Sequence, residues 1–215
     1  MRASGIILAA GKGERFGGPK VFAELGGVPV LLHSVRAFLA SQAVQELIVV
    51  VQPGAEAKAA ALLGDLGFPV RFVLGGMRRR DSSLAGAEEA NFEYVLVHDA
   101  ARPLVTPELI RQVLLAAEKH GAAVPVVPVV DTLRYVENGF LLGRPLPRAG
   151  LFAMQTPQAF RRDLLLMALR EANEELSDDA EALLRRGIPV AAVPGDPKNL
   201  KITYPEDLSL LSRLL

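Results

Sequence analysis

Short apolar runs of strand length alternate with helical patterns over the first 120 residues of the chain. These runs cover residues 6–9, 47–51, 70–73 and 94–98. The run 47–51 is apolar throughout and mostly β-branched, which is typical of a strand covered on both faces. Strands that alternate with helices predict an α/β fold with a Rossmann-like, doubly wound, mostly parallel sheet. In such sheets, ligands bind beyond the carboxyl ends of the strands.

Helical patterns separate these runs and continue to the C-terminus. Thr106 and Pro107 are residue types that cap and open a helix, and Gly121 suits its end. Asp178 and Glu181 have the spacing of a capping box. Helices are therefore expected at residues 28–39, 55–63, 81–90, 106–120 and about 161–172, with further ones beginning near residues 178 and 205.

The alternation breaks in the second half of the chain. Pro125 and Pro128 interrupt the apolar run 122–130, which suggests an edge or irregular strand, because proline cannot donate a ladder hydrogen bond. Asn138-Gly139 predicts a hairpin, which forms an arm at about residues 132–147 of a single domain spanning residues 1–215. A two-stranded ribbon is marginally stable alone, so the arm is expected to pack on a second subunit in a homodimer or to fold back on its own domain. A further strand is expected at residues 189–193 and a short extended piece at 198–203.

Residues 10–20 contain four glycines and three cations directly after the first strand. Glycines let backbone N–H groups approach an anion without a Cβ in the way, and fixed cations neutralise a polyphosphate. The spacing differs from the dinucleotide fingerprint, because Phe16 stands where its third glycine belongs, and Gly18-Pro19-Lys20 lacks the ending of a P-loop. The segment is either a phosphate-binding loop carrying Arg15 and Lys20 or a surface turn with solvated cations.

Polar residues also follow the later strands. Asp99 comes directly after residues 94–98, where a carboxylate suits a magnesium ion or the hydroxyls of a polyol, or else caps a turn. Arg102, three residues further on, favours a polar ligand there. Gly76 and the hydroxyl of Ser82 follow residues 70–73 and suit a nucleotide base and ribose, although Ser82 alone would serve equally as a helix cap.

Composition restricts the partners of the chain. Basic and acidic residues number 24 each, so no overall field attracts nucleic acid or an anionic membrane. The arginines at 78–80 have no aromatic residues among them and are expected to form a solvated loop. The chain has no cysteine, which excludes disulfides and a thiolate nucleophile and suits a reducing cytoplasm. No apolar run reaches the roughly 18 residues of a transmembrane helix, and no signal peptide is expected.

The motifs, taken together, resemble those of one enzyme family. AAGKGER with PK, at residues 9–15 and 19–20, has the pattern of the sugar and polyol phosphate nucleotidyltransferases. GGMRRRDSSLAG, VHDAARP, the Asp-Thr pair at 131–132, QTPQ and NLKITYPEDL then resemble, in order and spacing, the 2-C-methyl-D-erythritol 4-phosphate cytidylyltransferase family over essentially the whole chain. The resemblance implies transfer of CMP from CTP to that acceptor, with release of pyrophosphate, in the non-mevalonate isoprenoid pathway. It also implies magnesium bound with CTP and a homodimer with interlocking arms.

The resemblance also implies roles for single residues. It makes Arg15 and Lys20 the stabilisers of the transition state, and Arg148 and Lys201 the residues that position the acceptor phosphate. Two positions depart from the family: Met77, where an acidic or polar residue near the nucleotide is common, and Ser177, where the family usually has threonine before the two acidic residues. CTP would be bound by Ala9, Ala10, Gly11, Gly13, Gly76 and Ser82, and the acceptor by Asp99, Ala100, Arg102, Thr132 and Thr156, with Asp99 also a magnesium ligand.

Two other functions fit the same residues. A cytidylyltransferase for another polyol phosphate, such as ribitol 5-phosphate, would share most of these motifs. A catalytically inert nucleotide-binding module would keep the fold, although the joint presence of Arg15, Lys20, Asp99 and Lys201 argues against it. The sequence leaves open whether the residues of the arm serve their own subunit or the partner. The histidines at 33, 98 and 120 lack metal-ligand spacing and are expected to be structural.

Overall fold

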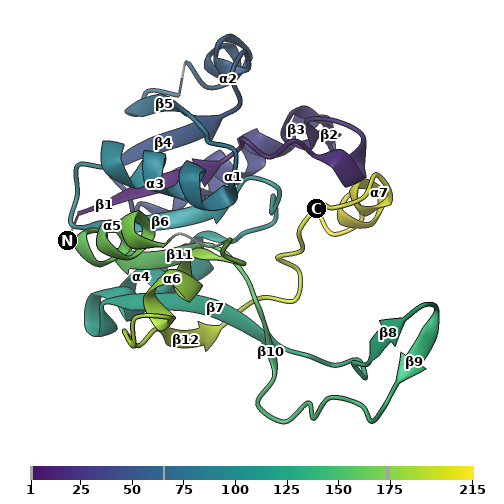
Figure 1. Cartoon of the computed structure of the whole chain (residues 1–215). Helices are drawn as coiled ribbons and strands as arrows, with labels where there is room; N and C mark the ends of the chain where they lie inside the picture. Colours follow the sequence, from purple (N-terminus) through teal and green to yellow (C-terminus); the bar gives the residue numbers. More distant parts are fainter. Residues whose placement is uncertain (1, 65, 173–174) are drawn as a thin grey trace.

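The computed structural model describes residues 2–64, 66–172 and 175–215, and within these residues the chain is built around an eight-stranded sheet (Figure 1). The strand order is β10-β7-β11-β6-β1-β4-β5, with β12 paired to β7. Its parallel centre consists of β1 (Ala3–Leu8), β4 (Glu46–Val51), β5 (Val70–Leu74) and β6 (Tyr94–Asp99). Every residue of β4 and β6 is buried, as expected of strands covered on both faces. The predicted mostly parallel α/β sheet is confirmed.

Helices cover both faces of the sheet because alternate strand residues point to opposite sides. Ile7, Leu47 and Val49 pack with residues of α1 (Val30–Ser41), α2 (Glu56–Leu63) and α4 (Pro107–His120). Ile6 and Ile48 pack with residues of α3 (Arg79–Glu89), α5 (Arg162–Glu171) and α6 (Asp179–Leu184) on the other face. The last helix is α7 (Glu206–Leu211). No helix in the described part of the chain is long and apolar enough to cross a membrane.

Several predicted helix ends are confirmed and two helix starts are wrong. Thr106 caps α4 by accepting the Leu109 N–H over 3.2 Å, and Gly121 ends the helix with a φ of 86°. The helix predicted from residue 28 begins two residues later, because β3 (Val28–Pro29) pairs with β2 (Glu24–Leu25). The helix predicted from residue 81 begins at Arg79, since the carboxylate of Asp81 accepts the Arg78 N–H over 3.2 Å and so caps the first turn. Ser82 therefore lies inside α3 and is not its cap.

The antiparallel end of the sheet departs most from the prediction. The edge or irregular strand predicted at residues 122–130 is β7 (Ala122–Pro128). It does not lie at an edge, because it pairs with β10 (Phe152–Met154) and β11 (Gln158–Arg161) antiparallel and with β12 (Ala191–Pro194) parallel. Pro125 has no N–H to donate to the ladder, but its carbonyl oxygen accepts a hydrogen bond from the Gln155 N–H over 2.8 Å. The sequence did not predict β10 or β11. β11 also pairs with β6 and joins this end to the parallel centre.

The predicted hairpin is formed by β8 (Tyr135–Glu137) and β9 (Phe140–Leu142). Asn138 and Gly139 have φ values of 51° and 83°, and positive φ at both positions is what a type I′ turn requires. The two strands form a separate sheet, and Figure 1 shows them projecting away from the central sheet on long connections. All six of their residues are exposed. The hairpin therefore does not fold back onto the sheet of its own chain.

Candidate active site

A cleft of about 970 Å³ opens at the carboxyl ends of β1, β4, β5 and β6. This is the edge at which the sequence predicts a ligand site. The glycine-rich loop after β1 forms one wall, and the C-terminal segment around Lys201 forms another. The predicted site residues that line the cleft are Ala10, Gly11, Gly13, Arg15, Lys20, Gly76, Ser82, Asp99 and Lys201.

The glycine-rich loop is folded around the carbonyl oxygen of Gly13. The backbone N–H groups of residues 16, 17 and 18 donate to this oxygen over 2.9, 2.9 and 3.2 Å. Gly13 has a φ of 66°, and a Cβ there would lie 1.9 Å from the carbonyl oxygen of Gly18. Only glycine fits such a position. Gln52, which follows β4, holds the start of the loop by donating to the carbonyl oxygen of Ala10 over 3.0 Å. The 3-10 turns η1 (Glu14–Phe16) and η2 (Lys20–Phe22) complete the loop.

Two glycines after β5 bring the backbone close to this loop and to α3. A Cβ on Gly75 would lie 2.4 Å from the Cβ of Ala10 and 2.8 Å from Oγ of Ser82. A Cβ on Gly76 would lie 2.3 Å from the Cβ of Asp81. The close packing requires glycine at both positions and leaves this part of the cleft lined by backbone, a surface that suits a base and ribose. The side chain of Met77 is almost fully exposed at the rim and makes no polar contact.

Two cations of the glycine-rich loop meet the C-terminal segment. Lys20 donates from Nζ to the carbonyl oxygen of Ile202 over 2.6 Å. Burial lowers the pKa of Lys20, and the neighbouring charge of Lys201 lowers it further. The guanidinium of Arg15 lies 5.8 Å from the ring centroid of Tyr204, within the range of a cation–π contact. Three positive charges thus converge on one wall, an arrangement that favours a polyanion.

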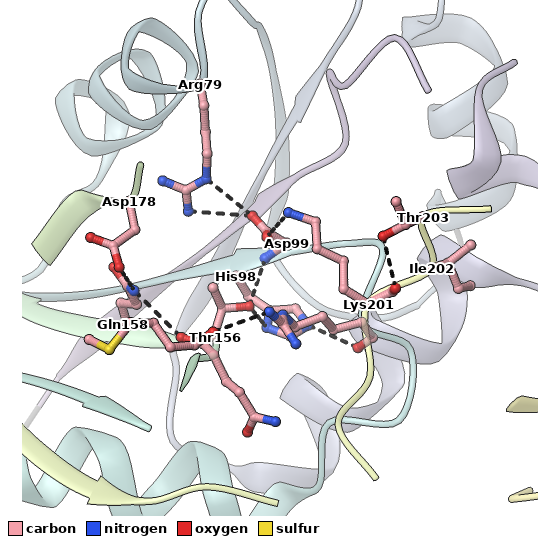
Figure 2. A network of polar contacts seen from close by, with 12 residues as sticks. Arg79, His98, Asp99, Thr156, Gln158, Asp178, Lys201, Ile202 and Thr203 are labelled. Carbon is pink, nitrogen blue, oxygen red and sulfur yellow. Dashed lines mark hydrogen bonds and ion pairs between the residues drawn. The ribbon is translucent and has the colours of Figure 1, made fainter. Parts of the chain in front are cut away.

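Asp99, at the end of β6, is held between two cations (Figure 2). Its Oδ1 accepts from Nε and Nη2 of Arg79 over 3.4 and 3.3 Å, and its Oδ2 accepts from Nζ of Lys201 over 2.6 Å. Burial raises the pKa of the Asp99 carboxyl, but the charges of Arg79 and Lys201 outweigh burial and lower it below the ordinary value. Asp99 is therefore an anion at neutral pH.

Behind Asp99, a buried hydrogen-bond network fixes the backbone. The Asp99 N–H donates to Oγ1 of Thr156 over 3.1 Å, and this hydroxyl lies 3.0 Å from Nδ1 of His98. Burial lowers the pKa of His98 to about 4, so the imidazole is neutral at pH 7. Its Nε2 lies 3.1 Å from the carbonyl oxygen of Arg102, which requires the proton on Nε2 and makes Nδ1 the acceptor for the Thr156 hydroxyl. Arg102 does not line the cleft, and its Nη1 donates to the carbonyl oxygen of Asn199 over 2.8 Å.

Not every predicted site residue lies at the cleft. Ala9 and Ala100 are buried. Arg102 and Thr156 belong to the network behind Asp99. Thr132 and Arg148 are exposed on the connections of the hairpin, where Arg148 donates to the carbonyl oxygen of Val130, and neither lines the cleft.

Arg79 is the functional-site residue that the sequence interpretation missed. The arginines at 78–80 were expected to form a solvated loop, but Arg79 begins α3 and lines the cleft. Its side chain is only 25% exposed and bridges Asp99 and Asp179. The sequence carries only a weak indication of this role, which is that the triplet follows the glycine pair after β5 and lies at the start of a helix.

Comparisons with known proteins point to one family. A profile described as 2-C-methyl-D-erythritol 4-phosphate cytidylyltransferase matches residues 4–215. The enzyme of that name from Cereibacter sphaeroides is 44% identical over 221 residues, covering 100% of this chain and 97% of the relative. The Acidobacterium capsulatum enzyme is 42% identical over 228 residues, covering 98% and 95%. The crystal structure of the Thermus thermophilus enzyme has a TM-score of 0.84 at 40% identity, covering 100% of this chain and 98% of that one. The chain therefore belongs to the 2-C-methyl-D-erythritol 4-phosphate cytidylyltransferase family of nucleotidyltransferases.

Proposed function

We propose that the cleft binds CTP and 2-C-methyl-D-erythritol 4-phosphate together and converts them to 4-diphosphocytidyl-2-C-methyl-D-erythritol and pyrophosphate. The observation that carries this proposal is the meeting of Lys20, Lys201 and Asp99, from three distant parts of the chain, at the carboxyl edge of the sheet. Such a cluster of cations around one anion suits two phosphorylated reactants that also carry hydroxyl groups. The whole chain acts as one catalytic unit, with the arm at about residues 132–147 as its dimerisation element.

The reaction needs charge stabilisation more than a protein nucleophile. A phosphate oxygen of the acceptor attacks the α-phosphorus of CTP, the bond from that phosphorus to the bridging oxygen of the β-phosphate breaks, and pyrophosphate leaves with the bond electrons. The protein must align two anions that repel each other and stabilise the charge that builds up between them. The cations at the cleft supply both effects.

The nucleotide lies along the glycine-rich loop in this proposal. Arg15 and Lys20 contact the triphosphate and stabilise the transition state, in which negative charge builds up near the α-phosphate. The partial burial of Lys20 strengthens its attraction to an anion, because less water screens the charge. The base, ribose and phosphates contact a surface formed by Ala9, Ala10, Gly11, Gly13, Gly76 and Ser82.

The acceptor lies beside Asp99. Lys201 binds its phosphate group and the carboxylate of Asp99 accepts hydrogen bonds from its hydroxyls. Arg102, Ala100 and Thr156 support this subsite from behind, because the Thr156 hydroxyl and the carbonyl of Arg102 are already committed to the network that fixes Asp99. Arg148 and Thr132 reach the acceptor from the arm of a second subunit, which is consistent with their position outside the cleft of their own chain.

Magnesium would enter with the nucleotide. Among residues 2–64, 66–172 and 175–215, no three acidic, histidine or cysteine side chains are grouped to hold a metal ion. The cleft presents the anionic carboxylate of Asp99, and magnesium in nucleotide enzymes usually combines one or two carboxylates with substrate phosphates. Asp99 therefore fits as the protein ligand. When bound, the ion would neutralise charge on the triphosphate.

The arm suits a homodimer interface. Tyr135, Val136, Phe140 and Leu141 are each between 63% and 75% exposed on a ribbon that pairs with nothing in its own chain's sheet. An apolar ribbon of this kind is stabilised by burial against a second copy. The cytoplasm supplies CTP and is the proposed location of the enzyme.

Steady-state assays with CTP and either methylerythritol phosphate or ribitol 5-phosphate test the proposed function. We expect pyrophosphate release that depends on methylerythritol phosphate and is much weaker with ribitol 5-phosphate. Exclusive use of ribitol 5-phosphate would establish the other polyol phosphate as the substrate, and no release with either acceptor would favour an inert nucleotide-binding module.

A further inference from the structure

Arg79 joins the proposed acceptor subsite to a buried carboxylate that lies outside it. One edge of its guanidinium, Nε with Nη2, faces Oδ1 of Asp99. The remaining nitrogen, Nη1, donates to Oδ2 of Asp179 over 2.8 Å. Asp179 is the first residue of α6, and its side chain is 1% exposed. The three residues come from α3, β6 and α6, so Arg79 ties three separate elements together at one point.

The chemistry of this bridge requires an arginine. A planar guanidinium presents several donors in fixed directions and can address two carboxylates at once, whereas an ammonium is a single point charge. Burial lowers the pKa of Arg79, but the carboxylates of Asp179 and Asp99 outweigh burial and raise it above the ordinary value, so the side chain stays charged. Buried ion pairs of this kind gain little net stability, since desolvation cancels most of the attraction. Stability alone is therefore a weak reason for the bridge.

The two cations on Asp99 are held differently. Arg79 is anchored by Asp179, and its side chain is 25% exposed. The side chain of Lys201 is 39% exposed. Among the described residues, its ammonium forms an ion pair with one carboxylate, that of Asp99. A substrate phosphate that approaches the cleft can therefore draw Lys201 away from Asp99 more easily than it can draw Arg79. Figure 2 shows the two side chains approaching the carboxylate from opposite sides.

We propose that Arg79 is a positioning residue of the acceptor subsite, and that Asp179 in turn holds Arg79. Arg79 keeps the carboxylate of Asp99 in place when Lys201 leaves it to bind the acceptor phosphate. The freed Oδ2 then meets the acceptor. This inference rests on the proposed function, because it assigns Asp99 and Lys201 to the acceptor.

The variants R79K and D179N test the inference through the two Michaelis constants. Loss of hydrogen bonds between charged groups predicts an increase of about tenfold to 100-fold in the KM for methylerythritol phosphate in R79K, with the KM for CTP nearly unchanged. D179N should show the same pattern with a smaller increase, because the amide still accepts from Arg79 but lacks the charge. A merely structural role would change the thermal midpoint without separating the two constants.

A matched control exists on the same face of the sheet as α3, near the amino-terminal ends of β4 and β5 and therefore away from the cleft. Arg71 also bridges two carboxylates, donating to Glu46 over 2.8 Å and to Glu89 over 3.3 Å, and it is not part of the cleft. R71K should therefore lose stability without changing either KM. Circular dichroism and thermal unfolding of all three variants separate the loss of fold from the loss of positioning.

The possible results distinguish this inference from the proposed function. An unchanged KM for methylerythritol phosphate in folded R79K overturns the inference, and so does an increase confined to the KM for CTP. If R79K does not fold, folded D179N decides by the same criterion. If the wild-type protein does not use methylerythritol phosphate at all, the proposed function itself fails.

Discussion

The ammonium of Lys20 donates a 2.6 Å hydrogen bond to the carbonyl oxygen of Ile202, a residue 182 positions further along the chain. This contact joins the glycine-rich loop to the C-terminal segment that carries Lys201. A small apolar cluster supports the same junction, since Phe16 packs with Leu25, Ile202 and Leu211. The C-terminal segment is therefore a wall of the cleft, and both lysines depend on it for their positions.

Replacement of Lys20 by alanine should slow catalysis strongly while the fold is retained. The loss of one preorganised charge near the developing anion predicts a fall in kcat of about 10²-fold to 10³-fold. The rate of pyrophosphate release under saturating CTP measures this kcat. Lys119 lies exposed in the last turn of α4, far from the cleft lining, so K119A serves as the control and should retain wild-type kcat. Unchanged kcat in K20A would remove Lys20 from the mechanism.

Asp99 should contribute stability that depends on pH. The charges of Arg79 and Lys201 keep its pKa in the folded state below the ordinary value of 3.8. Its contribution is therefore complete at neutral pH and is lost as the pH falls below about 4, toward the pKa of the folded state. In D99N, this contribution is absent at every pH. Urea unfolding should show a wild-type advantage over D99N at pH 7 that shrinks at pH 3, and an advantage that grows on acidification would contradict the ion pairing.

Gly13 and Gly17 form a matched pair for testing the loop. Both have positive φ, at 66° and 84°, but an added Cβ at Gly13 meets the Gly18 carbonyl oxygen at 1.9 Å, whereas at Gly17 it meets nothing within 4 Å. G17A should lose only about 1–2 kcal/mol of local stability, because alanine disfavours the left-handed conformation. G13A should in addition distort the loop and raise the KM for CTP. Equal KM values for CTP in the two variants would show that the loop shape does not matter for the nucleotide.

Mixing two inactive variants tests whether the arm acts across a dimer. A heterodimer of K20A and R148A contains one site with an intact Lys20 that faces the intact Arg148 of the partner arm. If Arg148 acts across the interface, mixing and re-equilibrating the two variants restores part of the activity. If Arg148 serves its own subunit, every site in the mixture lacks one of the two residues and no activity returns.

The apolar surface of the arm offers a separate test of assembly. Phe140 is 75% exposed in a ribbon that has no partner in the central sheet of its chain. A charge at this position should be costly to bury against a second subunit. Sedimentation velocity should show a dimer for the wild type and a monomer for F140D. A monomeric wild type would contradict the proposed role of the arm.

The central strands and the hairpin could be predicted because short stretches of sequence specify each of them. The β-branched run at 47–51 and the Asn138-Gly139 turn each specify their own structure, and both are confirmed. β10 and β11 were missed because three or four residues around a proline carry no clear period, and only pairing with β6 and β7 makes them strands. Arg79 was missed for a related reason. Its partners lie 20 and 100 residues away, and no local pattern distinguishes an inward arginine from its solvated neighbours.

The site prediction was limited in the same way. The resemblance to the family named Asp99 and Lys201, and the structure brings them within 2.6 Å. The sequence could not show that Thr156 and Arg102 lie behind Asp99, because that depends on how β11 inserts next to β6. Nor could it place Arg148, which is exposed on a connection of the hairpin and does not line the cleft of its own chain.

The most direct test of the account is a crystal structure of the protein with CTP and magnesium. We predict that the triphosphate lies against the glycine-rich loop, with Arg15 and Lys20 contacting its oxygens and Asp99 beside the α-phosphate. A triphosphate bound elsewhere on the protein, without contact to either cation, would contradict the claim that this cleft is where the two anions react.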